Sequence, residues 1–380
     1  MGVLAMNMQA FAMPFCAYMN PRAFRDDDPL NFALWCVSHV VADQKFITIF
    51  SMLFGAGIVL MTSRAEQRTG RSIWLHYRRM FWLAVFGAIH GIFIWYGDIL
   101  LTYALCGCLV FWFRRRSVPF LLISACLLIL IPALFMFGFE NFYDQMGAEE
   151  KREMMAMWSP DSDQLAEQLA DYRAGFIEQV PKRFKAWAEM FGFIFIFIWR
   201  ILGVMLIGMA LFKTRVLSAM RSQAFYTALL VTGFAVGLPL AAYGIYYNEA
   251  HGWTMKQSFG TGSLFNYFGS LFTALGWIGL IMLYCRKENA SGLRNRFAAV
   301  GRMAFTNYIM HSIICTLVFY GHGLGFYGEA GRIAQTLLIV AIAVFQLWYS
   351  PIWLKRFRFG PLEWLWRTLA YGKRQAMSYG

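Results

Sequence analysis

The chain contains repeated apolar segments that are long enough to cross a lipid bilayer as helices. A helix needs about 20 mainly apolar residues for this, because it rises about 1.5 Å per residue through a hydrocarbon core about 30 Å thick. We predict about ten such spans from this pattern. They cover residues 2–19, 45–62, 81–96, 99–113, 118–139, 190–212, 224–247, 264–284, 304–320 and 333–354. The predicted fold class is all-α, a polytopic transmembrane helical bundle that forms a single membrane domain over residues 1–380.

The composition supports the same class. Hydrophobic residues make up 59% of the chain and charged residues only 14%, whereas an ordinary soluble domain carries about 25% charged residues. A soluble core cannot hide this much apolar surface, so the lipid bilayer is the expected partner.

The basic residues are grouped at alternate ends of the predicted spans, and the formal net charge is +13. One side of the bundle receives Arg64, Arg68, Arg71, Arg78, Arg79, Arg114, Arg115, Arg116, Lys213, Arg215, Arg286, Lys287, Lys355, Arg356 and Arg358. Such groups mark the cytoplasmic side of a membrane protein. We therefore predict cytoplasmic termini and a multi-pass protein of a bacterial inner membrane. No compact basic face remains outside these groups, which argues against nucleic acid as a partner.

Two segments are predicted to lie outside the bilayer core. Residues 140–185 place Leu165, Leu169 and Tyr172 at helical spacing among charged residues, which predicts an extracytoplasmic amphipathic helical insertion. This insertion is either a cap over the bundle or a lid over a substrate site. Residues 356–380 include Trp364 and Trp366 and predict a cytoplasmic interfacial C-terminal segment.

The sequence gives little support to metal or disulfide chemistry. The seven cysteines are scattered through mostly apolar segments, and Cys106 and Cys108 are too isolated for a zinc or redox site. The six histidines form no pair with metal-ligand spacing, so we expect no metal site. The sequence also has no phosphate loop, dinucleotide-binding glycine pattern or nucleophile elbow.

Arg200 lies in the middle of a predicted span. A charge at this depth costs several kcal/mol unless it is paired, and it marks a functional site by default. The alternative is a structural ion pair with a neighbouring helix, for instance with Asp98 or Glu189.

His90 lies in the outer half of its predicted span, with Gly87, Ala88 and Gly91 around it. These small neighbours would let another helix or a ligand approach closely. Imidazole titrates near neutral pH, which suits general acid–base work. The alternative is a histidine that is buried and merely hydrogen-bonded.

Two polar pairs have a spacing of four residues, which places both members on one helix face. His39 and Asp43 would form an imidazole oriented by a carboxylate, or a solvated pair at the outer surface. Asn307 and His311 would form a polar pair near the middle of the membrane, or hydrogen-bond to a neighbouring helix.

Four separated motifs resemble the YeiB family of bacterial membrane proteins, a domain of unknown function, over essentially the whole chain. They are FITIFSMLFGAG at 46–57, HGIFIWYGDILLTY at 90–103, GRMAFTNY at 301–308 and FRFGPLEWLWR at 357–367. Family members usually carry a Leu-Asp-x-Leu-Arg-Gly segment ahead of the first helix, whereas this chain enters at Gly2, so we expect a shortened first span. No role of that segment is carried over.

The YeiB family is remotely similar to a wider group of transmembrane acyltransferases. That group includes the lysosomal heparan glucosaminide acetyltransferase and the bacterial O-acyltransferases of surface glycans, which take an acyl group from cytosolic acyl-CoA to an acceptor on the far side. The resemblance implies this fold and, by analogy, this chemistry.

The leading hypothesis is therefore an acyl-CoA-dependent O- or N-acyltransferase that acts on a glycan, lipid or small-molecule acceptor. His90, or His39 with Asp43, would deprotonate the acceptor, and Asp98 would orient His90 or bind acceptor hydroxyls. Arg200 or Asn307 would stabilise the oxyanion. The residues expected to bind the acyl-CoA phosphates, unless they are ordinary cytoplasmic-side charges, are Arg64, Arg71, Arg78 and Arg79. The residues expected to bind substrate are Asn307, His311, Tyr103 and Trp95.

Two other function classes fit the same residues. A transporter or exporter would use Arg200 and His90 along a substrate or proton path, and inverted repeats, which we do not find, would favour it. A non-catalytic membrane partner would leave both residues as packing groups. An oligomer is compatible with all three.

Overall fold

The computed structural model describes residues 1–24, 28–70, 72–287 and 291–379. Within them the regular structure is helical, apart from one isolated bridge between Phe357 and Ser378. The predicted all-α class is therefore confirmed.

Six helical segments of the described chain are long and apolar enough to cross a membrane. They are Pro29–Gln67, Val118–Gln145, Phe176–Lys213, Gln223–Ala250, Met255–Arg286 and Arg332–Arg356. Two shorter apolar segments, Leu100–Phe113 and Ala304–Phe319, accompany them. A membrane protein is indicated, while the count of about ten spans stays a prediction.

The N-terminal half of the chain contains several broken helices. It runs through α1 (Gly2–Ala12), α2 (Phe15–Met19), α3 (Pro29–Val41), α4 (Lys45–Thr69), α5 (Ser72–Ile89), the π-helix η1 (His90–Ile94), α6 (Leu100–Val110), α7 (Val118–Phe142), α8 (Ala148–Trp158) and α9 (Ser162–Arg173). The predicted single span 2–19 is broken at Pro14, because proline has no amide hydrogen to continue the helix.

The C-terminal half contains the longest helices. It runs through α10 (Phe176–Lys213), α11 (Gln223–Ala250), α12 (Met255–Gln257), the π-helix η5 (Ser258–Gly262), α13 (Ser263–Arg286), α14 (Ser291–Arg302), α15 (Ala304–Phe319), α16 (Arg332–Arg356) and α17 (Pro361–Tyr371). The 3₁₀ turns are η2 (Phe111–Phe113), η3 (Tyr143–Gln145) and η4 (Val216–Ser218).

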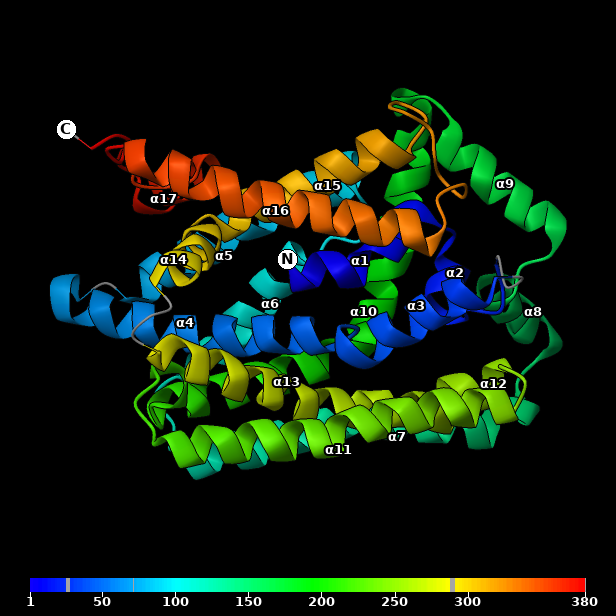
Figure 1. The fold of residues 1–380 in the computed structure, drawn as a ribbon, viewed down its shortest axis with the longest axis horizontal. Helices are drawn as coiled ribbons and strands as arrows, with labels where there is room; N and C mark the ends of the chain where they lie inside the picture. Colours follow the sequence, from blue (N-terminus) through cyan, green and yellow to red (C-terminus); the bar gives the residue numbers. More distant parts are fainter. Residues whose placement is uncertain (25–27, 71, 288–290, 380) are drawn as a thin grey trace.

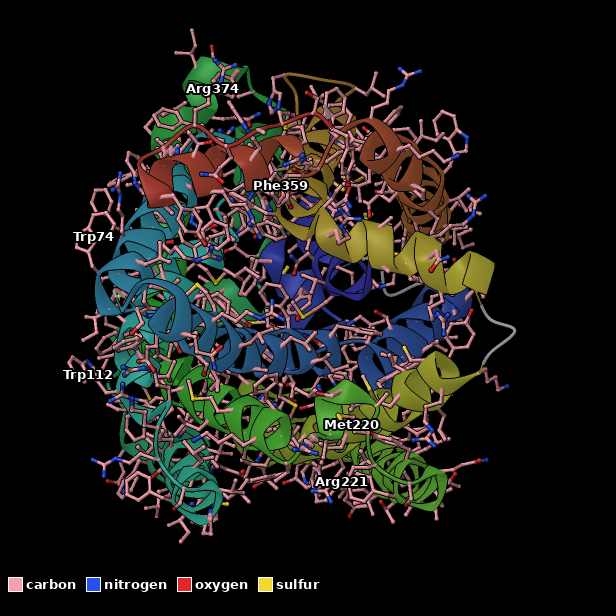
Figure 2. The ribbon with its side chains drawn as sticks, turned by 90° about the vertical axis from the view of Figure 1, so that its left-hand side faces the viewer. Trp74, Trp112, Met220, Arg221, Phe359 and Arg374 are labelled. Carbon is pink, nitrogen blue, oxygen red and sulfur yellow. The ribbon has the colours of Figure 1, made fainter. Side chains whose placement is uncertain are left out.

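The long helices α4, α11, α13 and α16 run roughly side by side along one direction of the molecule, and α10 runs obliquely across them (Figure 1). Helices α8 and α9 lie at one end of this direction, and α14 and α17 lie at the other (Figure 1). Figure 2 views the second end, where Arg221 and Arg374 lie with Trp74 and Trp112. Cations and tryptophans at helix ends are typical of a membrane interface.

Helix α10 crosses α4 at very close range. A Cβ on Gly55 of α4 would overlap the carbonyl of Met205, and one on Gly208 of α10 would overlap the carbonyl of Met52. Glycine at both points lets the two backbones touch, which is how membrane helices gain packing energy without a hydrophobic driving force. This crossing sets the position of Arg200, two turns before Gly208.

The outer surface of the long helices is apolar. Large side chains such as Leu134 on α7, Tyr246 on α11 and Leu337 on α16 are exposed. On a soluble protein this surface would drive aggregation, whereas in lipid it costs nothing. Polar side chains are instead found buried between the helices, and the candidate site is among them.

Candidate functional site

A buried chain of three polar side chains lies where α5 ends. His90 opens the π-helical turn η1, and the chain then folds back through Asp98 into α6. Ser312 comes from the middle of α15. Each of the three residues is at most 3% exposed, so the site is closed to bulk water in this conformation. π-helical turns of this kind are frequent at functional sites.

The three side chains are connected through the two nitrogens of the imidazole. His90 Nδ1 lies 2.9 Å from Asp98 Oδ1, and His90 Nε2 lies 2.8 Å from Ser312 Oγ. Asp98 Oδ2 accepts the Leu101 amide at 2.9 Å, which holds the carboxylate at the start of α6. Because a carboxylate accepts from an N–H, Nδ1 is assigned the proton, which leaves Nε2 as the acceptor of the Ser312 hydroxyl.

Gly87 makes room for this arrangement. A Cβ at Gly87 would overlap the Leu101 amide nitrogen and would lie 2.8 Å from Asp98 Oδ2. Gly87 therefore admits the carboxylate loop of the same chain, whereas a Cβ at Gly91 would overlap the Trp187 ring.

Two aromatic residues with polar atoms stand beside His90. The ring of Tyr308 lies 5.2 Å from the imidazole, and the ring of Trp95 lies 6.3 Å away. The Tyr308 hydroxyl and the Trp95 indole nitrogen are both buried, and neither makes a hydrogen bond of normal geometry within the described chain. The Trp95 indole still interacts with the Tyr320 hydroxyl, so the Tyr308 hydroxyl is the better candidate to meet an oxygen of a substrate.

A second polar cluster is built around Asp43, in the turn between α3 and α4. Asp43 accepts hydrogen bonds from Tyr18 at 2.5 Å and from Asn266 at 3.1 Å, and its carboxylate lies 3.1 Å from His39 Nδ1. The His39 ring stacks on Trp35 at 4.6 Å. The two residues four apart in sequence are thus in contact, and α2 and α13 contribute their partners.

Lys45 and Arg200 extend this cluster. Lys45 donates to the His39 carbonyl at 2.6 Å and to Asn266 Oδ1. Arg200 donates to Gln44 Oε1 at 2.7 Å, and its guanidinium lies 4.4 Å from the Tyr267 ring. Arg200 also donates to Ser270 Oγ at 2.7 Å and to the Tyr267 carbonyl at 3.1 Å.

The partners of Arg200 differ from those expected. Asp98 binds His90, and Glu189 lies 3.9 Å from Lys185. Arg200 instead donates to neutral oxygens and lies against one aromatic face, and Asp43 is the negative charge that interacts with it. The interpretation as an ion pair with Asp98 or Glu189 was therefore wrong. Gln44 reaches it from a left-handed backbone conformation with φ of 60°, which is rare for a residue other than glycine.

Tyr103 lies between the two clusters. Its hydroxyl is 2.5 Å from Ser51 Oγ, and it interacts electrostatically with both Arg200 and Tyr308. His39 and His90 belong to different clusters and make no contact with each other in the described chain. Trp95 packs in the core, stacked on Phe11 at 3.9 Å.

Asn307 and His311 face α16. Asn307 Nδ2 donates to the Val300 carbonyl at 3.1 Å and to Ser350 Oγ at 3.3 Å, and Gln346 donates to the Asn307 carbonyl at 3.2 Å. His311 also interacts with Gln346. These contacts form a polar seam between two helices, the alternative that the sequence left open.

The arginines predicted to hold phosphates are spread along the α4 and α5 ends. Arg64 is exposed on α4, and Arg71 lies outside the described residues. Arg78 stacks on Trp74 at 4.8 Å and lines a shallow groove with Ile73, Tyr77 and Phe81. Arg79 stacks on Trp366 of α17 at 4.2 Å.

Ser312 was not among the residues singled out from the sequence. Its one signal is a hydroxyl directly after His311 in an apolar span, and nothing in the spacing links it to His90, 222 residues earlier. Among the described residues, no group of three or more His, Cys, Asp or Glu side chains lies close enough together to hold a metal ion.

The comparisons with known proteins give relatives without an assigned activity. The chain is 30% identical over 391 residues to the uncharacterized protein YxaH of Bacillus subtilis, covering 97% of this chain and 91% of the relative. It is 28% identical over 382 residues to the uncharacterized protein YeiB of Escherichia coli, covering 97% and 92%. No solved structure matches. A family model described as "Protein of unknown function (DUF418)" matches residues 211–373. Together with relatives matched over nearly their whole length, the family model shows that the chain belongs to the YeiB-like DUF418 family.

Proposed function

We propose that the chain is a bacterial inner-membrane acyltransferase that moves a small acyl group from cytosolic acyl-CoA to an extracytoplasmic or envelope acceptor. The observation that carries the proposal is His90, whose Nδ1 is held by Asp98 while Nε2 faces a hydroxyl. This is the arrangement that general-base catalysis of acyl transfer to a hydroxyl requires.

The surroundings of His90 suit this chemistry. The site is buried, so a nearby thioester would be protected from hydrolysis and hydrogen bonds to a developing oxyanion would be strong. The Tyr308 hydroxyl is the candidate donor to that oxyanion, in place of Arg200 and Asn307, which bind elsewhere.

The donor would approach from the basic end of α5. Arg78 lies 12 residues before His90, or about 18 Å along a helix at 1.5 Å per residue. The extended pantetheine arm of CoA is of comparable length, so phosphates held at Arg78 and Arg79 would place the thioester near His90. Arg64 is exposed on the neighbouring helix α4. We therefore expect it to attract the anionic donor in general and not to bind a particular phosphate.

Binding and turnover separate these roles. Calorimetry with acetyl-CoA on detergent-purified protein should give saturable binding that the double change Arg78→Ala and Arg79→Ala weakens at least tenfold. His90→Ala should bind normally and fail to transfer the acyl group to an extract of envelope acceptors. Arg221→Ala removes an arginine at the same end of the molecule and should change neither measurement (Figure 2).

One outcome rejects the proposal outright. If folded protein binds no acyl-CoA of any chain length, the donor is wrong, and the family resemblance has carried over only a fold.

Transport is the second candidate, and the Asp43 cluster is what favours it. Lys45, Arg200 and Asp43 place two positive charges and one negative charge inside the bundle, and intramembrane charges often line ion or substrate paths. Flux of organic anions into proteoliposomes that Arg200→Gln abolishes, without any acyl-CoA binding, would favour this function.

A further inference from the structure

We infer that Ser312 is the nucleophile of the reaction and carries the acyl group as an ester between donor and acceptor. The inference rests on the proposed acyl transfer and adds to it a covalent, two-step course. The geometric basis is the linear order Asp98, His90, Ser312, which is the order of carboxylate, imidazole and hydroxyl in serine-dependent acyl transfer.

The hydrogen bond of Ser312 is unusual for a serine in a helix. A helical serine or threonine commonly donates to the carbonyl four residues before it. Ser51 donates to Ile47 and Thr48 donates to Gln44 in this way. Ser312 makes no such bond within the described chain, and its hydroxyl meets His90 Nε2 instead. The hydroxyl is thus directed to a base across a helix interface.

Ser312 also lies where a covalent carrier would be useful. It occupies the middle of α15 and is fully buried, between a donor that would come from the cytoplasm and an acceptor that would come from the other side. An ester at this point lets the two substrates bind at different times. Exclusion of water slows its hydrolysis.

A donor for the oxyanion stands on the same helix face. Tyr308 precedes Ser312 by four residues, so both side chains project to the same side of α15. The buried Tyr308 hydroxyl is without a hydrogen bond of normal geometry, beside the backbone at Ile99. It is available to the carbonyl oxygen of a group bonded to Ser312 Oγ.

The chemistry balances in both steps. In the first, Ser312 Oγ bonds to the thioester carbon while its proton passes to His90 Nε2, and the C–S bond breaks as that proton moves to the CoA sulfur. In the second, the acceptor hydroxyl or amine attacks the ester carbon and gives its proton to Nε2. The ester C–O bond then breaks, and the proton returns to Ser312 Oγ. His90 ends each cycle neutral.

The test is to trap the intermediate. Full-length protein in detergent is incubated with acetyl-CoA without acceptor, quenched in acid, and measured by intact mass and peptide mapping. We expect one added acetyl group on the peptide that contains Ser312, together with one equivalent of released CoA. Adding acceptor should discharge the label.

Three variants make the result specific. Ser312→Ala should abolish the label while acetyl-CoA still binds. Ser312→Cys should carry a thioester that neutral hydroxylamine removes, which the serine ester resists. The matched control is Thr316→Val, which changes a buried hydroxyl one turn along α15 that donates to the Ile313 carbonyl, and it should label as the wild type does.

The outcomes separate this inference from the proposed function. Transfer to acceptor that persists in Ser312→Ala would overturn the nucleophile and leave an acyltransferase with direct transfer. A wild-type protein that binds no acyl-CoA would overturn both. Label on a residue other than Ser312 would also reject the inference, while the acyl transfer itself would stand.

Discussion

At the scale of single residues, the molecule uses its buried polar groups in two distinct ways. His90 has one nitrogen committed to Asp98 and the other directed at Ser312, an arrangement that leaves a base free to exchange a proton. Arg200 has its charge spread over Gln44, Ser270, Tyr267 and Thr48, an arrangement that leaves little donor capacity unused. The first pattern suits turnover and the second suits stability.

Asp98→Asn should act on turnover through the histidine. An amide at this position offers a hydrogen as well as an oxygen to Nδ1, so the tautomer with a basic Nε2 is no longer enforced. We expect kcat for acyl transfer to fall by about 10²–10⁴-fold, the usual contribution of a positioned base, with unchanged affinity for acetyl-CoA. The pH dependence of the residual rate should also shift.

Asp144→Asn is the matched control, because Asp144 pairs with Lys256 at an exposed point. A merely structural role for Asp98 would show as weaker acyl-CoA binding or lower stability with an unshifted pH profile.

Arg200→Ala should destabilise the fold. The change leaves the oxygens of Gln44 and Ser270 without their donor and removes a cation from the Tyr267 ring. Hydrogen bonds to a charged group are worth about 1.5–3 kcal/mol each, so we expect a loss of several kcal/mol in unfolding in mixed micelles. Arg115→Ala, at a side chain 72% exposed, should change stability by less than about 1 kcal/mol.

At the scale of helices, breaks and close contacts position the polar groups. The π-helical turn at His90 and the left-handed Gln44 at the start of α4 both interrupt apolar segments beside the clusters. The crossing of α4 and α10 at Gly55 and Gly208 brings Arg200 against the α4 start. Each cluster therefore depends on one irregular backbone point.

Gly208→Ala tests the crossing. Its Cβ would overlap the Met52 carbonyl, so α4 and α10 must separate, at a typical overpacking cost of about 1–3 kcal/mol. Gly192→Ala on the same helix meets no atom within 4 Å and should be neutral or stabilising by up to about 1 kcal/mol. Thermal unfolding of the two variants compares them directly, and equal melting temperatures would show that the close crossing contributes nothing.

The sequence predicted what depends on nearby residues and missed what depends on distant ones. The all-α class follows from apolar segment length, and the His39–Asp43 contact follows from a spacing of four. The bond from His90 to Ser312 joins residues in different helices, which one sequence cannot reveal. The partners of Arg200 were missed for the same reason. The break in the predicted span 2–19 was missed because the apolar residues continue past Pro14, and the span was predicted from their length.

At the scale of the whole molecule, the predicted orientation in the membrane rests on the charges at the two ends of the bundle. Arg221 and Arg374 share the end shown in Figure 2, and α8 and α9 lie at the opposite end in Figure 1. Positive charge on one end favours its retention in the cytoplasm, with the α8–α9 segment outside.

Reporter fusions test this orientation. Alkaline phosphatase joined after Ser159, between α8 and α9, should be active, and the same enzyme joined after Arg221 should be inactive. A fluorescent protein that folds only in the cytoplasm should give the reverse pattern. Activity of both phosphatase fusions would contradict the placement of basic groups inside.

The π-helical turn that begins at His90 also has a consequence for reading related sequences. Such a turn holds one residue more than an α-helical turn, and eight positions separate His90 from Asp98. The length of this interval therefore determines where the carboxylate meets the imidazole. Deleting one residue from this interval, for example Ile92, would remove the extra residue of the turn and shorten the connection from His90 to Asp98. A relative in which this interval has another length should therefore lack the contact between the histidine and the carboxylate, even where both residue types remain.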